Sequence, residues 1–488
     1  MKGLMMCKNI SVKFIILSLF ILFICIFLRL YCLGYESLWT DEAFSALFPA
    51  RPFNEWLWLK EEVHPPLYYV LMHYCLIFGH DEFAVRLPSA ICGIITLVFS
   101  FKLANGKENS SEALLTLILL GLSSMAVFTD RMARMYSLLC MLCVLAAFFL
   151  KKALKQEKGI FPWIGYVTAS VALLYTHYSA FIFLLSLNIY FFIFWKHTRK
   201  YIIKWIVCQI LTGLFFLPWL KMFLRHMSIG GGQLLPVPDI KIISDVFIHL
   251  IYGGIFPLPV YFYPFIFIPV FIIFYFGAVS DYKKRNKWDF YLPVCLFIIP
   301  LIITLSISIF TPKRIFSEKH FYYVIPFLYI ILARGIEHIR YKSNKLVAMV
   351  LILFVLFLNI YSIGNRFFLE KHQNADWRTS VAQMERLARQ GDVILIQDSL
   401  QCNAFYYYNK KRFPSYTIGP ENIPHDIAVL TANYDRIWLI RCLDWLSDPD
   451  GLVRKWLSEN CSLKKRYVYF RIDRGSVITV ELYENRKR

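Results

Sequence analysis

The sequence WTDEAF, at residues 39–44, places two adjacent carboxylates, Asp41 and Glu42, shortly after a long apolar segment. That segment, Val12 to Leu30, is long enough to cross a bilayer, and no small-residue cleavage site follows it. We therefore expect a retained first transmembrane helix rather than a removed signal peptide. Adjacent carboxylates at a membrane interface are costly unless they are solvated, paired or used. A solvated loop with Asp41 as a helix N-cap is the simplest alternative to a functional role.

The composition indicates a bilayer as the solvent of most of the chain. Of the 488 residues, 58% are hydrophobic and 18% are aromatic, and the mean hydropathy is +0.51. This is too apolar for one globular core to bury. The formal net charge of +20 could suggest a nucleic-acid partner, but the basic residues fall in short clusters between apolar runs, as in the cytoplasmic loops of membrane proteins. Membrane lipids are expected to contact the chain, and nucleic acid is not.

Long apolar runs predict an α-helical polytopic membrane protein with about eleven transmembrane helices. The runs lie at residues 13–31, 87–104, 113–129, 135–150, 161–176, 179–195, 201–220, 260–279, 288–310, 321–333 and 346–363. Basic loops at 151–158, 196–200, 283–287 and 334–345 are expected to be cytoplasmic by the positive-inside rule. An odd number of spans with a cytoplasmic N-terminus places the C-terminus on the outer side. The single cysteines within the spans, and the pair Cys140 and Cys143, are expected to pack as small apolar side chains.

The polar parts of the chain are expected to lie outside. Residues 32–86 carry an excess of acidic residues and form the first outer loop. Within this loop the apolar stretch 65–78 is too short to cross the membrane, so it is expected to be a re-entrant or interfacial helix. We expect a transmembrane domain at 1–363 and a soluble domain at 364–488.

The sequence of the soluble tail predicts a small α/β domain. A helix is expected from Trp377 to about Ala388, followed by a turn and a strand at 393–396. Further strands are expected at 437–442, 466–472 and 476–483, with a helix at 452–460.

Four short motifs follow one another on the expected outer face. They are the acidic pair after the first span, HPPLYY at 64–69, ARMYSLL at 133–139 and YTHY at 175–178. In this order and spacing they resemble glycosyltransferase family 39, the dolichyl-phosphate-mannose protein mannosyltransferases and their bacterial relatives, including the aminoarabinose transferase of lipid A. The similarity continues into DWR at 376–378 and GDV at 391–393, so it covers nearly the whole chain.

The resemblance implies the GT-C architecture, with the active site where the outer loops meet the membrane and a polyprenyl-phosphate-linked sugar as the donor. Asp41 matches the family's catalytic acidic position. A carboxylate there can accept the proton of an acceptor hydroxyl that attacks the anomeric carbon. We expect Asp41 to be the general base and Glu42 to orient either Asp41 or the acceptor.

The leaving group of this reaction is a lipid phosphate, whose charge is stabilised by nearby cations and by the N-terminal end of a helix. The candidates for donor phosphate binding are His64, Arg134, Lys319 and His320, together with Arg131. Each has a structural alternative. His64 can be a polar residue ahead of a helix, and Arg134 can extend its charge to the membrane interface.

Two further polar residues have less certain motif matches. Relatives commonly carry a second acid where this chain has Met132, and Asp130 is the candidate second acid, although it would face a different direction on a helix. His177 of YTHY is a candidate ligand for a divalent metal ion, which needs several convergent ligands, or a contact to the donor. Its alternative role is that of an interfacial turn residue. The tyrosines at 406–408 could stack on a sugar, but packing is the favoured interpretation.

The sequence therefore predicts a membrane glycosyltransferase that uses a polyprenyl-phosphate-sugar and acts on a lipid, a cell-envelope glycan or a protein. A bacterial inner or plasma membrane is the expected location. The first alternative to this enzyme is a transporter or flippase of lipid-linked sugars, which would show intramembrane charges or broken helices in paired halves. The second alternative is a non-catalytic envelope-assembly protein.

Overall fold

A computed structural model describes residues 12–52, 63–104, 111–156, 159–229, 236–253, 259–279, 286–342, 344–369, 374–397, 402–418, 425–442, 448–470 and 477–486. The chain forms two compact units. The first comprises residues 1–31, 56–71 and 87–363, and the second comprises 32–55, 72–86 and 364–488. The expected division into domains at 1–363 and 364–488 stays a prediction.

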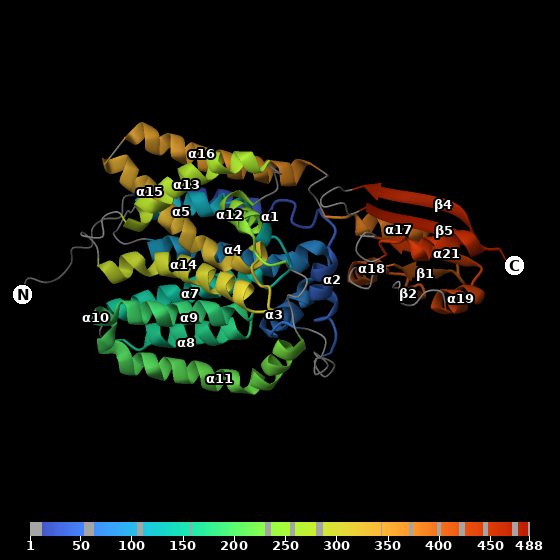
Figure 1. Ribbon diagram of the computed structural model, residues 1–488, viewed down its shortest axis with the longest axis horizontal. Helices are drawn as coiled ribbons and strands as arrows, with labels where there is room; N and C mark the ends of the chain where they lie inside the picture. Colours follow the sequence, from blue (N-terminus) through green and yellow to red (C-terminus); the bar gives the residue numbers. More distant parts are fainter. Residues whose placement is uncertain are drawn as a thin grey trace, which may run out of the picture. The chain divides into compact units, whose positions relative to one another are not determined.

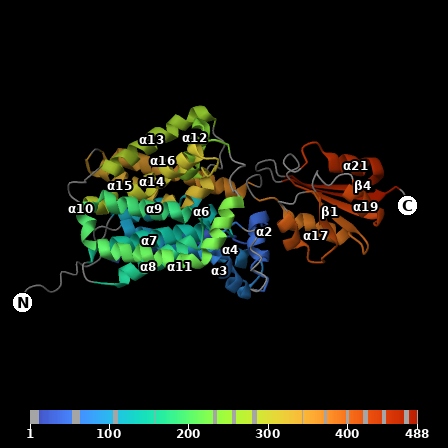
Figure 2. The same cartoon turned by 60° about the horizontal axis from the view of Figure 1, so that its bottom comes forward.

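The first unit is a bundle of apolar helices (Figure 1). Its helices, including α3, α4 and α16, which begin or end in the second unit, are α1 (Val12–Leu30), α3 (Leu67–Cys75), α4 (Glu82–Ala104), α5 (Ser111–Gly121), α6 (Ser124–Asp130), α7 (Tyr136–Lys155), α8 (Phe161–Leu174), α9 (Ser179–Ile193), α10 (Trp195–Thr198), α11 (Ile202–Ile229), α12 (Ile240–Tyr252), α13 (Tyr263–Val279), α14 (Lys287–Phe310), α15 (Ile325–Lys342) and α16 (Lys345–Phe368). Short 3₁₀ turns of this unit lie at η3 (Arg199–Tyr201), η4 (Val260–Phe262) and η5 (Glu318–Val324), whereas η2 (Leu76–Phe78) belongs to the second unit. Helices α7, α8, α9 and α14 lie side by side in both views (Figure 1, Figure 2).

Length and composition make the chain an integral membrane protein. Among the described residues, seven helices are long and apolar enough to cross a membrane, and an eighth span results if α5 and α6, bent by 63°, count as one. Each expected apolar run coincides with a helix, three of them with the shorter apolar helices α8, α9 and α13. The total of eleven spans stays a prediction. The stretch at 65–78 forms the short α3 and η2, as expected.

Two features of this unit differ from the sequence-based expectation. Helix α12 was not expected, because the polar residues on one side of it interrupt the apolar run in the sequence. Asp239 caps its first turn by accepting the Ile242 N–H at 2.7 Å. The expected basic loop from Arg334 does not begin there, because α15 continues to Lys342. The reason is that Arg334 is buried and paired with Glu112 at 2.6 Å, so its charge does not end the helix.

Close backbone approach holds α13 against α15. A Cβ on Gly277 would lie 2.0 Å from the carbonyl oxygen of Ile331, and one on Gly335 would lie 1.8 Å from that of Ile273. Neither position tolerates any side chain without a shift of the backbone. Small residues at such contacts are the usual means by which helices pack tightly in a membrane.

A buried ion pair joins the first helix to the end of α6. The Arg29 Nε lies 2.8 Å from Asp130, and the two side chains are 0% and 1% exposed. Asp130 also accepts hydrogen bonds from Tyr322 at 2.6 Å and from Ser137 at 3.0 Å. Arg29 donates as well to the carbonyl oxygen of Gly121, the last residue of α5 before the bend. The pair therefore ties together α1, the α5–α6 bend, α7 and η5.

The second unit contains a five-stranded sheet in the order β2-β1-β3-β5-β4. The strands are β1 (Val393–Ile396), β2 (Ser415–Thr417), β3 (Arg436–Arg441), β4 (Cys461–Phe470) and β5 (Val477–Asn485). β1 pairs in parallel with β2 and β3, whereas β5 is antiparallel to β3 and β4. The helices of this unit are α2 (Thr40–Leu47), α17 (Trp377–Leu387), α18 (Cys402–Tyr408), α19 (His425–Ala432) and α21 (Leu452–Asn460).

The sheet is covered on both faces, which explains the continuous apolar sequence of β1. Val393 and Leu395 pack in one cluster with Ile427 of α19 and Leu457 of α21. Successive side chains of a strand point to opposite faces, and all four residues of β1 are buried. The expected helix at 377–388 and the strands at 393–396, 437–442 and 476–483 are confirmed, whereas β2, α18 and α19 were not expected.

The buried pair of Arg29 and Asp130 leads to a prediction about stability. Asp130→Asn leaves the Arg29 charge buried without a counterion, so the free energy of unfolding should fall by about 3–5 kcal/mol. Lys155→Ala is the matched control, because Lys155 is 41% exposed and its pair with Asp289 should contribute about 1 kcal/mol or less. Thermal unfolding of the full chain in detergent measures both, and equal shifts for the two variants would contradict the assignment.

Candidate active site

The acidic motif forms the first turn of α2. The helix begins at Thr40, and the backbone N–H of Trp39 is 3.4 Å from the carboxylate of Glu42. Trp39 is the N-cap residue and Asp41 lies inside the first turn, so the alternative that Asp41 is the N-cap is wrong. Asp41 is half-buried, and its carbonyl oxygen accepts a hydrogen bond from Ser45 at 3.0 Å. A carboxylate in a first turn is stabilised by the helix dipole.

Glu42 is bound by Arg86 in the same unit. Its two carboxylate oxygens each lie 2.8 Å from a guanidinium nitrogen, one from Nε and one from Nη2. Glu42 is 1% exposed, so this two-point ion pair is removed from water. The geometry matches the planar fork of arginine to the carboxylate.

Arg86 also organises the loop before α2. Its remaining N–H groups donate to the carbonyl oxygens of Leu33, Glu36 and Ser37 at 2.9–3.1 Å. Together with the two bonds to Glu42, these contacts use all five donors of the guanidinium. The carboxylate of Glu42 therefore fixes the position of Asp41 through Arg86. Sequence reasoning did not single out Arg86, although a buried acid in this loop requires a cation and the loop holds few.

Three histidines from distant parts of the sequence meet in the first unit. The ring centroids of His64 and His177 are 5.5 Å apart, and those of His177 and His320 are 5.9 Å apart. Tyr136, at the start of α7, lies 6.1 Å from His177 by the same measure. His64 precedes α3, His177 lies in the turn between α8 and α9, and His320 is in η5. We call His64, His177, His320 and Arg134 the basic cluster.

Hydrogen bonds show whether Nδ1 acts as a donor or as an acceptor in two of these rings. The backbone N–H of Ser179 donates to Nδ1 of His177 at 3.1 Å, so the neutral ring carries its proton on Nε2. Burial lowers the pKa of His177 well below its usual value, and the charge of His64 lowers it further. His177 is therefore a neutral donor at neutral pH. Nδ1 of His320 lies 2.8 Å from the carbonyl oxygen of Ile315, which fixes that nitrogen as a donor.

The other expected basic residues fall into two groups. Arg134 is buried in the turn between α6 and α7, and its charge also lowers the pKa of His177. Lys319 is the neighbour of His320 in η5. Arg131 instead donates to the carbonyl oxygens of Leu28 and Tyr31 at 3.1 and 2.7 Å, which gives it a structural role at the end of α1.

The expected roles of Asp130 as a second acid and of His177 as a metal ligand can be compared with the contacts that these residues make. Asp130 is enclosed by Arg29, Tyr322 and Ser137 in the ion pair described above. Within the described ranges, no group of three or more His, Cys, Asp or Glu side chains has an arrangement that could hold a metal ion. His177 in particular presents an N–H on Nε2 rather than a lone pair, so the residues present fit an anion better than a divalent cation.

The chain resembles known proteins both in sequence, over part of its length, and in fold. Residues 63–221 match the sequence family described as dolichyl-phosphate-mannose-protein mannosyltransferase. No curated protein is similar to the chain in sequence. The structure is similar to ArnT from Cupriavidus metallidurans in the apo state, with a TM-score of 0.60 and 15% identity over 96% of this chain and 97% of ArnT.

Two further solved structures share the fold. ArnT from Cupriavidus metallidurans bound to undecaprenyl phosphate has a TM-score of 0.57 at 14% identity, over 96% of this chain and 97% of ArnT. The oligosaccharyltransferase AglB from Archaeoglobus fulgidus, in complex with an inhibitory peptide and a dolichol-phosphate, has a TM-score of 0.59 at 10% identity, over 96% of this chain and 76% of AglB. The chain therefore shares the overall fold of ArnT and of the oligosaccharyltransferase AglB, and its residues 63–221 match the mannosyltransferase family.

Proposed function

We propose that the chain transfers a sugar from a polyprenyl phosphate to an acceptor hydroxyl or similar nucleophile at the outer face of a membrane. The observation that carries this proposal is the basic cluster. His64, Arg134, His177 and His320 come from four separate segments of the first unit. The rings of His64 and His320 lie 5.5 and 5.9 Å from that of His177, and the charge of Arg134 lowers the pKa of His177. Such a convergence of donors suits an anion that is too highly charged for the membrane without them.

The basic cluster is assigned to the donor phosphate. As the bond between the anomeric carbon and the phosphate oxygen breaks, the electron pair and the negative charge remain on the polyprenyl phosphate. Arg134 supplies a permanent positive charge, and His177 donates from Nε2 without changing its protonation state. Lys319 adds a positive charge beside His320. The leaving group then needs no proton.

Asp41 is assigned the role of general base. The acceptor oxygen forms its bond to the anomeric carbon while its proton passes to the carboxylate of Asp41. The negative charge that Asp41 loses on protonation equals the charge that the departing polyprenyl phosphate gains. Glu42 is a positioning residue, because its carboxylate is occupied by Arg86 and cannot also bind a substrate. Asp130 is assigned a structural role, because Arg29, Tyr322 and Ser137 enclose it.

The charge pattern of the sequence indicates the side of the membrane on which the reaction takes place. Basic residues near the ends of α7 and α15, and before α11, favour a cytoplasmic location for those ends. The N-terminus is then cytoplasmic, and the C-terminal residues with their α/β sheet lie outside, in a bacterial inner or plasma membrane. A lipid, a cell-envelope glycan or a protein can be the acceptor.

A flippase of lipid-linked sugars remains the main alternative class. Its signature is a pair of broken helices in corresponding halves. In the described part of the chain only one bent pair, α5 and α6, was found, and Arg29 donates to the carbonyl oxygen at its bend. Two pairs of buried charges inside the described bundle, Arg29 with Asp130 and Arg334 with Glu112, neutralise each other.

The first functional prediction concerns Asp41. Asp41→Asn should lower kcat for transfer from a radiolabelled polyprenyl-phosphate-sugar by about 10²–10⁴-fold, the usual contribution of a general base. The donor KM should change little, because the amide retains the size of the side chain. Asp450→Asn, which removes an exposed acid of the tail, is the control. Near-normal transfer by the Asp41 variant would overturn the assignment, and donor flipping without transfer by the wild type would favour the transporter.

The second prediction concerns the basic cluster. Arg134→Ala should weaken binding of the polyprenyl phosphate, which the donor contains and the reaction releases, by about ten- to a hundredfold, because a charged hydrogen bond contributes about 1.5–3 kcal/mol. Titration of the full chain in nanodiscs with undecaprenyl phosphate measures this affinity directly. The control is Arg199→Ala, which removes an exposed arginine of η3. Equal affinities for the Arg134 variant and the wild type would place the phosphate elsewhere.

The third prediction concerns metal ions. Because His177 offers a proton rather than a lone pair, transfer should stay within about twofold after dialysis against EDTA. The rate before and after dialysis is compared at equal protein concentration. Loss of activity that Mn²⁺ or Zn²⁺ restores would show that the donor site uses a metal ion, despite the hydrogen bond from Ser179 to Nδ1 of His177.

A further inference from the structure

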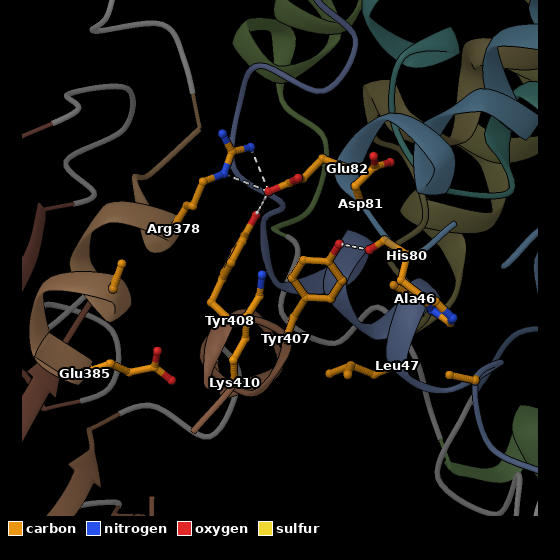
Figure 3. Close-up of a pocket in the computed structure, with 12 residues that line it drawn as sticks. Ala46, Leu47, His80, Asp81, Glu82, Arg378, Glu385, Tyr407, Tyr408 and Lys410 are labelled. Atoms are coloured by element: carbon orange, nitrogen blue, oxygen red, sulfur yellow. Dashed lines mark hydrogen bonds and ion pairs between the residues drawn. The ribbon is translucent and has the colours of Figure 1, made fainter. Parts of the chain in front are cut away.

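A cavity of about 560 Å³ lies within the second unit (Figure 3). Its walls come from the end of α2, from the residues just before and at the start of α4, and from α17 and α18. Pockets that bind small organic ligands usually have volumes of about 300–1,000 Å³. The cavity therefore has room for a ligand of one or a few sugar rings. None of its lining residues belongs to the acidic motif or to the basic cluster.

One wall of the cavity is fixed by a hydrogen-bond network. Glu82 lies 2.8 Å from Nε and 2.7 Å from Nη2 of Arg378, and the hydroxyl of Tyr408 donates to the same carboxylate at 2.8 Å. The Tyr408 oxygen in turn accepts the backbone N–H of Leu38 at 2.8 Å. Figure 3 shows Arg378 and Tyr408 converging on Glu82 from two sides. The network holds this wall in place before any ligand binds, which lowers the entropy cost of binding.

A second tyrosine presents its ring to the cavity. Tyr407 donates its hydroxyl to the carbonyl oxygen of His80, and its ring meets that of Tyr408 edge to face, at 4.8 Å and 87°. Both contacts fix the plane of the Tyr407 ring. The side chain is only half-buried, so part of it remains available to a ligand. A rigid aromatic ring with polar neighbours is an apolar surface suited to the C–H face of a sugar.

The polar groups of the cavity favour a neutral polyhydroxyl ligand over an anion. The carboxylates are those of Asp81, Glu82 and Glu385, and the cations are Arg378 and Lys410. Arg378 already pairs with Glu82, which leaves an excess of negative charge. In Asp81 and Glu385 one oxygen accepts a backbone N–H, from Ala84 and from Lys411, and the second oxygen can accept from a ligand hydroxyl. A lipid phosphate would be repelled.

Apolar side chains stand exposed just before the cavity in the sequence. Tyr74, Ile77 and Phe78 are 56%, 76% and 89% exposed, and His80 of the cavity wall follows two residues later. A cluster of exposed large apolar side chains in a membrane protein is suited to contact with lipid. Contact between this turn and the bilayer would bring the cavity near the membrane surface, where a glycan attached to a lipid would be found.

We propose that this cavity is the acceptor subsite and that it binds the sugar of a glycan acceptor. The inference rests on the proposed glycosyltransferase function and narrows the acceptor from a lipid, a glycan or a protein to a molecule that presents a sugar. The ring of Tyr407 stacks on that sugar, and the carboxylates of Asp81 and Glu385 accept hydrogen bonds from its hydroxyls. The sugar is either part of a lipid-linked glycan or part of a free one, and both present the same chemistry.

Binding measurements without the donor test the subsite independently of catalysis. The probes are methyl glycosides of mannose, glucose, galactose and N-acetylglucosamine, observed by saturation-transfer NMR with the full chain in nanodiscs. At least one probe should bind the wild type. Tyr407→Ala and Glu385→Gln should each weaken that binding at least fivefold, whereas Tyr407→Phe, which keeps the ring, should retain it. Tyr406→Ala is the matched control, because Tyr406 is exposed and does not line the cavity.

A second set of probes separates the two sources of the sugar. Dodecyl glycosides of the same sugars are placed in vesicles of phosphatidylethanolamine and phosphatidylglycerol. Binding of the dodecyl glycosides at least tenfold tighter than the methyl glycosides supports a lipid-linked acceptor, and equal binding supports a free glycan. If no glycoside of either set binds, or if Tyr407→Ala and Tyr406→Ala bind equally well, the subsite is wrong.

The two proposals fail in different ways. Asp41→Asn should keep glycoside binding while losing transfer, because Asp41 does not line the cavity. Conversely, Tyr407→Ala should raise the KM for a sugar acceptor at least fivefold with an unchanged KM for the donor. Glycoside binding without any transfer by the wild type would overturn the glycosyltransferase function and retain the sugar site. Transfer with equal acceptor KM for the wild type and Tyr407→Ala would retain the function and overturn the subsite.

Discussion

The ion pair between Glu42 and Arg86 is the constraint on which the acidic motif depends. A buried ion pair is favourable only if nearly every donor and acceptor finds a partner, because both charges lose their hydration. Arg86 meets this condition by donating to Glu42 and to three carbonyl oxygens of the loop before α2. These contacts fix the loop before α2, and Asp41 lies next to Glu42 in the first turn of that helix.

Carboxylates that look alike in the sequence have different surroundings in the structure. Glu42, Glu112 and Asp130 are all buried, and each is matched to one arginine from a distant segment. The pairs of Glu112 and Asp130 give the helical bundle specific contacts that apolar packing alone does not provide, and the pair of Glu42 does the same for the second unit. The acids of the cavity in the second unit are instead half-buried or exposed and share their surroundings with aromatic rings. Burial and pairing thus separate structural acids from acids that can meet a ligand.

Hydropathy predicted most helices of the first unit because the bilayer leaves the backbone few alternatives to a helix. The same method missed α12, whose polar face breaks the apolar run, and it ended one span at Arg334, whose charge is neutralised inside the bundle by Glu112. Motifs identified His64, His177 and His320 separately, but no spacing in the sequence could show that the rings of His64 and His320 lie 5.5 and 5.9 Å from the ring of His177. The hydrogen bond from Ser179 to His177, which favours an anion over a metal ion, is likewise a property of the folded turn.

The pair of Arg29 and Asp130 also has a consequence for biosynthesis. Arg29 lies in the last turn of α1, and Asp130 follows 101 residues later. At about 5–20 residues per second, translation needs roughly 5–20 s to supply the counterion. During that interval the side chain of Arg29 must remain hydrated or bind a lipid headgroup near the interface, and α1 cannot yet occupy its final depth. Synthesis of α5 and α6 then allows α1 to take its final position, so the contacts of α1 with these helices form only after Asp130 has been made.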